Sequence, residues 1–189
     1  YRPTQRGLLA HYRAVADASS VPVVLYNVPG RTAVDLLPET SAALAEHPGI
    51  IGLKEAVPGA DRMRTLRRLC GPEFRLLSGD DDTCGEAMLA GADGVISVVA
   101  NLVPALMNGL AECALNGDRE GLASLQARLA PLFRQMSVET NPIPVKWAAY
   151  EMALAGPGIR LPLLPLAEQL RPALRAVLEA LEPGSGTEE

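Results

Sequence analysis

Short apolar runs alternate with longer amphipathic segments along the first hundred residues of the chain. The apolar runs at residues 21–26, 50–54, 74–77 and 94–99 predict four buried strands. Helix-forming segments lie before and between these runs, at residues 4–18, 38–47, 60–69 and 83–90. Near-continuous apolar strands that alternate with helices are typical of a parallel sheet with helices covering its faces. The pattern therefore predicts an α/β fold.

The alternation stops after residue 101. From there the spacing of apolar residues predicts helices at residues 101–115, 121–137, 144–155 and 166–181. The last seven residues, rich in Gly and Glu, favour disorder. We therefore expect three parts: an α/β region at 1–115, a helical C-terminal region at 116–182 and a disordered tail at 183–189.

Four strand–helix units are half the number in a (β/α)₈ barrel, which takes about 250 residues when complete. An open doubly wound sheet of four strands is an alternative on the pattern alone. Neither interpretation explains why the chain begins in a helix-forming segment without a strand before it.

Composition narrows the classes of partner. Hydrophobic residues make up 48% and aromatic residues 4%, and the net charge is −5, which argues against a nucleic-acid-binding protein. The apolar runs are too short to span a membrane. The three cysteines have no CxxC spacing, so they favour neither a disulfide framework nor a metal site. We expect a cytoplasmic protein without nucleic-acid or membrane partners.

Lysine is rare in this sequence. The 17 basic residues comprise fifteen arginines and only two lysines, Lys54 and Lys146. Codon bias with two chance survivors is one explanation. The other is chemical, since a lysine amine loses its proton and attacks carbonyl groups, whereas a guanidinium does not.

Working residues of parallel α/β folds lie where strands end. Lys54 ends an apolar run, where burial lowers the pKa of an amine and favours Schiff-base formation with a ketone or aldehyde. Tyr26 ends the preceding strand, and its phenol is suited to proton relay. In the loop after it, Arg31 offers a planar guanidinium for a carboxylate.

Each of these residues also has a structural interpretation. Lys54 could be salt-bridged or extend its amine to solvent, and Tyr26 could pack at the rim of the sheet. Arg31 could pair with Asp35. The acidic run at 80–82 suggests a metal site, but we favour capping of the helix that follows.

Five segments in this order resemble the dihydrodipicolinate synthase family of pyruvate-dependent aldolases. They are YNVPGRT at 26–32, GLKEA at 52–56, SGDD at 78–81, GVISV at 94–98 and NPIPVKWA at 141–148. The resemblance implies a (β/α)₈ TIM barrel followed by a helical C-terminal region, in a homotetramer. The chain would hold the second half of the barrel within residues 1–115.

The activity that the resemblance implies is that of a lyase in lysine and diaminopimelate biosynthesis. It condenses pyruvate with L-aspartate 4-semialdehyde to 4-hydroxy-tetrahydrodipicolinate. Lys54 would form the Schiff base with pyruvate, so that no separate cofactor or metal is needed, and Tyr26 would donate and accept protons. Arg31 would bind the semialdehyde carboxylate. Gly79 and Ile96 would line the pyruvate pocket, Ile96 through its main-chain carbonyl, and Lys146 would be structural.

The sequence departs from the family pattern because no segment matches the first half-barrel, where a Thr-Thr pair holds the pyruvate carboxylate. Tyr1 stands one position nearer to Arg2 than the family tyrosine that reaches into a neighbouring subunit, and it receives no role. We therefore expect these 189 residues alone to be inactive. The alternatives are another pyruvate aldolase, such as N-acetylneuraminate lyase or a keto-deoxy-sugar-acid aldolase, and a non-catalytic relative that only assembles.

Overall fold

The structure is a computed structural model that describes residues 2–181, in two compact units. One unit holds the chain up to Ser97 together with Cys113–Asp118, and the other holds Val98–Glu112 and the residues from Arg119 onward. Tyr1 and the tail expected at 183–189 lie outside the described residues.

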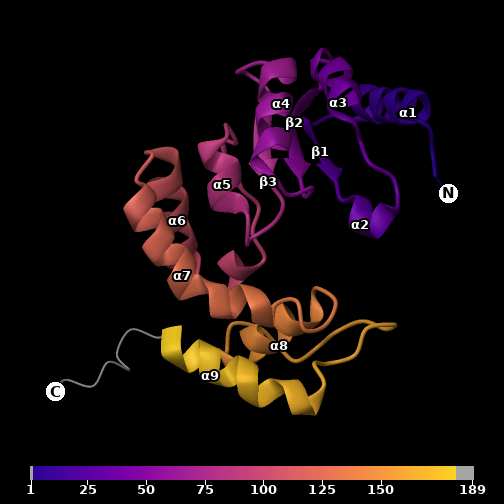
Figure 1. Cartoon of the computed structure of the whole chain (residues 1–189). Helices are drawn as coiled ribbons and strands as arrows, with labels where there is room; N and C mark the ends of the chain where they lie inside the picture. Colours follow the sequence, from indigo (N-terminus) through magenta and orange to yellow (C-terminus); the bar gives the residue numbers. More distant parts are fainter. Residues whose placement is uncertain (1, 182–189) are drawn as a thin grey trace. The chain divides into compact units, whose positions relative to one another are not determined.

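The first unit contains a four-stranded parallel sheet in the order β1-β2-β3-β4 (Figure 1). The strands are β1 (Val23–Asn27), β2 (Ile50–Glu55), β3 (Arg75–Ser78) and β4 (Gly94–Val95). The helices of this unit are α1 (Gln5–Ala18), α2 (Pro29–Thr32), α3 (Pro38–Ala45), α4 (Ala60–Cys70) and α5 (Cys84–Leu89). Strands and helices alternate along the chain, so the predicted parallel α/β arrangement is confirmed.

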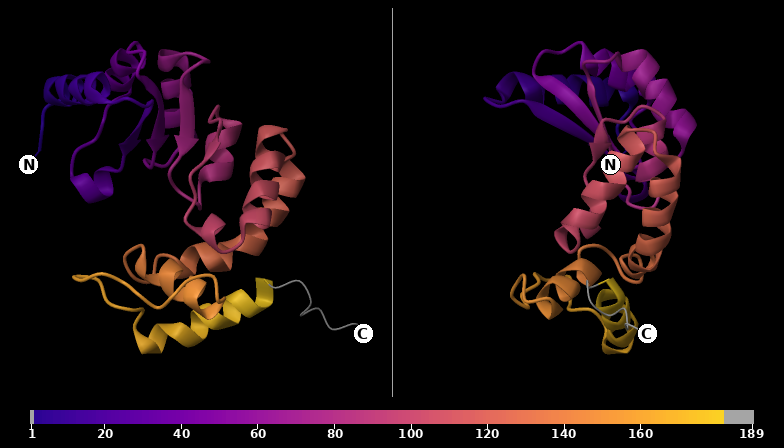
Figure 2. Two further views of the ribbon diagram at one scale, coloured as in Figure 1. Left: turned by 180° about the vertical axis from the view of Figure 1, so that it is seen from behind. Right: turned by 90° about the vertical axis from the view of Figure 1, so that its left-hand side faces the viewer.

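The two faces of the sheet differ in burial. Leu25, Leu53 and Leu76 are paired across the strands and are at most 2% exposed. Helices α3 and α4 pack against β2 and β3 and cover one face of the sheet (Figure 2), and burial assigns the three leucines to that face. Burying one such leucine side chain contributes about 1.5–3 kcal/mol. On the opposite face, Val24 is 42% and Tyr26 44% exposed. The sheet is thus anchored through one face, while the other is open in the described residues.

Two local elements differ from the sequence-based expectation. Arg31 was expected in a loop after Tyr26, but Pro29 begins the short helix α2, because proline at the first helical position already has the required φ. The strand expected at 94–99 ends at Val95, and Val99–Asn101 forms the 3-10 helix η1. An apolar run of this length fits a buried strand or a buried helical turn equally well, and Val99 is fully buried in the helical turn.

The second unit is helical. It contains η1, most of α6 (Pro104–Leu115), α7 (Arg119–Gln135), α8 (Ile143–Glu151), η2 (Glu168–Leu170) and α9 (Arg171–Leu181). Its core includes Leu110, Leu129, Leu132 and Leu174, which are fully buried. The four predicted helices are present, although the one expected from residue 166 starts as η2. Among the described residues, no helix has both the length and the apolar character needed to cross a membrane.

The close approach of β2 and β3 gives a test of the sheet. A Cβ added to Gly52 would lie 2.6 Å from the carbonyl oxygen of Arg75, so Gly52→Ala must push the two strands apart. Overpacking of this kind costs about 1–3 kcal/mol. We expect the free energy of unfolding, measured by urea denaturation, to fall by that amount.

The matched control is Gly30→Ala, because a Cβ at Gly30 meets nothing within 4 Å. Gly30 lies in α2, where alanine is favoured over glycine, so we expect stability to be unchanged or slightly higher. Equal free energies of unfolding for the two variants would contradict the close strand packing.

Candidate active site

Tyr26 and Lys54 lie side by side at the carboxyl ends of neighbouring strands. Parallel pairing of β1 with β2 places Tyr26 opposite Lys54, so both side chains leave the same face of the sheet. The Lys54 Nζ lies 4.5 Å from the centroid of the Tyr26 ring. The structure therefore brings together the two residues for which the sequence predicted catalytic roles.

The surroundings of Lys54 favour a neutral amine. Burial lowers the pKa of Lys54, the charge of Asp81 raises it and the charge of Arg31 lowers it, with a net shift below the ordinary value of 10.5. The Tyr26 ring favours the ammonium form through a cation–π contact, which opposes the effect of burial. Asp81 and Arg31 therefore act on this amine in opposite directions.

Gly79 packs directly against the Lys54 stem. A Cβ added to Gly79 would lie 3.0 Å from Lys54 Cε and 3.1 Å from Lys54 Cγ, closer than most side-chain contacts. The absence of a side chain at Gly79 therefore leaves room for the extended lysine. Ile96 follows β4 directly, and its backbone N–H donates to the carbonyl oxygen of Ser78 at 2.9 Å.

Arg31 is an exposed residue of α2, near enough to Lys54 for its charge to lower the pKa of that amine. The alternative pairing of Arg31 with Asp35 is not what the structure has. Asp35 instead accepts hydrogen bonds from Arg62, at 2.7 and 2.9 Å, and from Asn27. Arg31 thus has no ion pair with Asp35.

A buried polar cluster that the sequence analysis did not identify lies on the helix-covered face of the same strand ends. It consists of Asn27, Asp35, Glu55 and Arg62. Asn27 follows Tyr26 and Glu55 follows Lys54, and the Asn27 amide donates to the two carboxylate oxygens of Glu55 at 2.9 and 3.1 Å. Asn27 and Glu55 are 3% and 2% exposed. A glutamate directly after an apolar run was the one available signal, since burial of such a group requires partners.

Burial and hydrogen bonding act in opposite directions on the two carboxyl groups of this cluster. Burial raises the pKa of Glu55, although the Val57 N–H, the Asn27 amide and Arg62 each lower it. Burial also raises the pKa of Asp35, but the hydrogen bonds from Arg62 and Asn27 and the Arg62 charge outweigh it and give a lowered pKa. Asp35 is accordingly the more firmly ionised of the two.

Within the acidic run at 80–82, Asp80 binds Thr83, the residue directly before α5. Asp80 Oδ2 accepts from the Thr83 N–H at 3.2 Å and from the Thr83 hydroxyl at 2.8 Å. Within residues 2–181 the structure contains no group of three or more His, Cys, Asp or Glu residues able to hold a metal ion. Burial, with the charges of Asp81 and Asp80, raises the pKa of the neighbouring Cys84 to about 12, which disfavours the thiolate form that a nucleophile needs.

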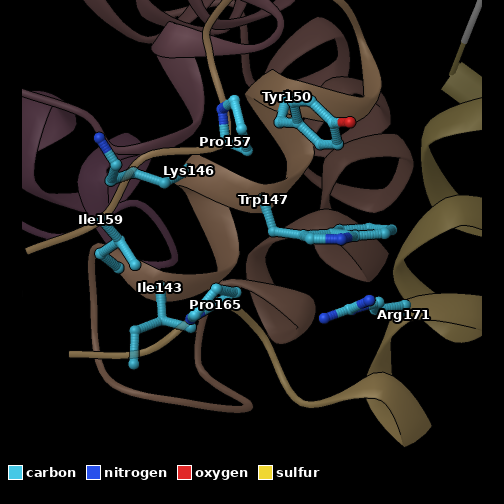
Figure 3. Close-up of a pocket in the computed structure, with 8 residues that line it drawn as sticks. All are labelled: Ile143, Lys146, Trp147, Tyr150, Pro157, Ile159, Pro165 and Arg171. Atoms are coloured by element: carbon cyan, nitrogen blue, oxygen red, sulfur yellow. The ribbon is translucent and has the colours of Figure 1, made fainter.

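Among the cavities in the described residues, one in each unit lies beside a residue considered above. The first, of about 230 Å³, reaches Tyr26 from the side of α1 and is lined by Pro3, Leu8, His11, Tyr12, Tyr26, Asn27, Thr32, Val34 and Leu36. The second, also about 230 Å³, is shown in Figure 3 and is lined by Ile143, Lys146, Trp147, Tyr150, Pro157, Ile159, Pro165 and Arg171. In contrast to Lys54, Lys146 is exposed on its helix. The chemically suited lysine is therefore Lys54.

Comparisons with known proteins show the family to which the chain is similar. The model of the dihydrodipicolinate synthetase family matches residues 1–181. The 4-hydroxy-tetrahydrodipicolinate synthase of Alcanivorax borkumensis is 49% identical over 177 residues, which are 94% of this chain and 60% of the relative. The chain thus spans about three fifths of the length of the curated relatives it matches.

Solved structures show the same likeness. The chloride-inhibited dihydrodipicolinate synthase of Acinetobacter baumannii, complexed with pyruvate, matches with a TM-score of 0.91 and 47% identity, over 95% of this chain and 62% of that one. The Thermotoga maritima enzyme matches with a TM-score of 0.89 and 40% identity, over 94% and 62%. The fold is that of part of a TIM barrel followed by a helical C-terminal region, as the sequence predicted. The chain belongs to the dihydrodipicolinate synthetase family.

Proposed function

We propose that the protein condenses pyruvate with L-aspartate 4-semialdehyde to 4-hydroxy-tetrahydrodipicolinate, in the biosynthesis of lysine and diaminopimelate. The observation that carries the proposal is the pairing of a lysine of lowered pKa with a tyrosine on adjacent strand ends. The name of the Alcanivorax borkumensis relative and the pyruvate bound to the Acinetobacter baumannii relative support the same reaction.

Lys54 is the nucleophile in this proposal. Its neutral amine attacks the ketone carbon of pyruvate, and the carbinolamine that forms loses water to give a protonated Schiff base. Loss of a methyl proton gives an enamine, whose carbon attacks the aldehyde of the second substrate. Tyr26 exchanges protons with the carbinolamine oxygen and with the new alkoxide, since its phenol both donates and accepts. The amino group of the second substrate then attacks the Schiff-base carbon and displaces the Lys54 amine, which closes the ring and frees the product.

Three further residues position the substrates. Arg31 binds the carboxylate of the semialdehyde through its exposed guanidinium. The backbone at Gly79 lines the pyruvate pocket, and its lack of a side chain leaves room for the Lys54 stem. The main-chain carbonyl of Ile96, directly after β4, faces the pyruvate pocket. The pyruvate carbon skeleton is held covalently by Lys54, so the reaction uses no separate cofactor or metal.

We also propose how the chain is divided into parts and how it assembles. We assign residues 1–115 to the second half of the barrel and residues 116–182 to the helical C-terminal region. The family resemblance implies a homotetramer, although one solved relative is described as a monomeric variant. The composition of the chain is the basis for proposing a cytoplasmic location.

Trapping of the Schiff base tests the role of Lys54. With pyruvate and borohydride, the peptide that holds Lys54 should gain the mass of the reduced adduct, while the Lys146 peptide should not. Because only the neutral amine attacks, the trapping rate should rise with pH and then reach a plateau. The midpoint, the pH at which the rate is half of its plateau value, should lie below 10.5. Peptide mass spectrometry across a pH series measures both quantities.

The charges around Lys54 provide controls for this experiment. Asp81→Asn removes a charge that raises the pKa of Lys54, so its midpoint should move to lower pH. Lys54→Arg should give no adduct. An adduct confined to Lys146, or a midpoint at the ordinary lysine value, would contradict the proposal.

Arg31 should act on the second substrate. Arg31→Ala removes a charged hydrogen-bond donor worth about 1.5–3 kcal/mol, so we expect the KM for the semialdehyde to rise by about tenfold or more. Pyruvate trapping should be retained at a pH above the midpoint, where the amine is neutral in both proteins. Steady-state kinetics and trapping, both on the protein as its gene encodes it, measure the two effects. Equal loss of both would mean that Arg31 is structural.

The 189-residue chain alone should turn over little substrate. The sheet face that carries Tyr26 is open in the described residues, and the chain covers about three fifths of its relatives. Imperfect positioning and access of water cost about a hundredfold or more in rate. A condensation assay against the Alcanivorax borkumensis enzyme tests this, and addition of the part of that enzyme which the chain does not match should restore activity. Comparable rates without it would disprove the expectation.

A further inference from the structure

Helix α4 carries two arginines that bind opposite ends of the sheet. Arg62 lies in the first turn of α4 and binds beside the carboxyl ends of β1 and β2. Arg67 lies about one and a half turns later and binds beside the amino ends of β3 and β4. The two side chains are 15% and 22% exposed. They are therefore similar in burial and differ in what they hold.

The Arg62 guanidinium joins three segments. Its Nε donates to Glu55 Oε2 at 3.1 Å, and its two terminal nitrogens donate to the Asp35 carboxylate at 2.9 and 2.7 Å. One of these nitrogens also donates to the Leu36 carbonyl oxygen at 2.8 Å. A planar group with five N–H donors makes this set of bonds, and a lysine ammonium with three donors does not reproduce its geometry.

Asn27 completes the connection between these segments. Its amide donates to Glu55 and, at 2.7 Å, to Asp35 Oδ1, while its own oxygen accepts from the Leu36 N–H at 3.0 Å. The loop that carries Arg31 is therefore fastened at both ends, at Asn27 where it leaves β1 and at Asp35 and Leu36 where it approaches α3.

Each anchored residue is adjacent to one with a proposed role. Asn27 follows Tyr26, Glu55 follows Lys54, and the fastened loop presents Arg31. We infer that Arg62 is a positioning residue, which holds Tyr26, Lys54 and Arg31 in a single arrangement from the opposite face of the sheet. This inference rests on the proposed function for the meaning of that arrangement, but the arrangement itself is measurable without substrate.

A purely structural role is the competing explanation, and Arg67 shows what such a role looks like. Arg67 donates mainly to backbone carbonyl oxygens, those of Gly91, Gly71 and Phe74, and to the carboxylate of Asp93. None of these residues neighbours Tyr26, Lys54 or Arg31 in the sequence. Arg67→Lys is therefore a matched control for Arg62→Lys, because it makes the same change on the same helix.

The first measurement needs no substrate. In the protein as its gene encodes it, acetic anhydride labels Lys54 and Lys146, and peptide mass spectrometry gives the ratio of the two rates. In Arg62→Lys we expect the Arg31 loop to move away and the amine to become more hydrated, so that the pKa of Lys54 rises. One pKa unit is a tenfold change in the neutral fraction, and we expect the Lys54 to Lys146 ratio to fall by about threefold or more. In Arg67→Lys the ratio should stay as it is in the unsubstituted protein.

The second measurement is kinetic. Arg62→Lys should raise the KM for the semialdehyde by about tenfold, because a displacement of about 1 Å at a positioning group has effects of this order or larger. Arg67→Lys should leave this KM unchanged, even where both variants lower the Tm. If Arg62→Lys does not fold, Asp35→Asn replaces it, since it removes the carboxylate that the guanidinium binds and keeps the size of the side chain.

The outcomes separate the two proposals. An unchanged labelling ratio in the Arg62 or Asp35 variant, or an equal change in Arg67→Lys, overturns the positioning role whatever reaction the protein catalyses. A changed ratio confined to the Arg62 or Asp35 variant supports it. Failure of pyruvate to trap on Lys54 in the unsubstituted protein overturns the proposed function instead, and the labelling ratio still decides the role of Arg62.

Discussion

The parallel register of β1 and β2 is the constraint on which the candidate site depends. It sets Tyr26 opposite Lys54 on one face and Asn27 opposite Glu55 on the other. Because side chains alternate between faces, a slip of one residue in β2 would turn Lys54 toward the helices and bring Glu55 to the side of Tyr26. The Asn27–Glu55 hydrogen bonds form only in the observed register. The buried cluster on one face and the Tyr26–Lys54 pair on the other therefore depend on each other.

Lys54 shows why position and residue type have to agree. Burial alone lowers the pKa of an amine, but a deeply buried lysine would be out of reach of substrate, and Lys54 is only partly buried. The remaining control comes from charges, with Arg31 favouring the neutral amine and Asp81 the ammonium. Arginine stays protonated in proteins and could not serve at this position, which gives a chemical reason for a lysine in a chain with fifteen arginines.

Much of this arrangement was predictable from local sequence, and the unpredicted part is non-local. Apolar runs place strand ends at Tyr26 and Lys54, and parallel strands bring their carboxyl ends to one edge. The hydrogen bonds of Asp35 to Arg62, by contrast, link residues 27 positions apart. Nearness in sequence offered Arg31 as one possible partner of Asp35, but α4 presents Arg62 from the covered face. The early end of β4 likewise depends on the burial of Val99, which an apolar run does not reveal.

The location of the buried cluster bears on its purpose. Replacing a buried ionic cluster by well-packed apolar side chains is often neutral or stabilising, so stability alone is a weak reason for Glu55 and Arg62 to meet between the sheet and α4. What the cluster provides that leucines would not is direction, because its hydrogen bonds fix angles as well as distances. Directional contacts are most useful where displacements are most costly, at the ends of the strands that carry the reacting groups. The difference between Arg62, which binds carboxylates at that end, and Arg67, which binds mainly backbone carbonyl oxygens at the other, follows from this requirement.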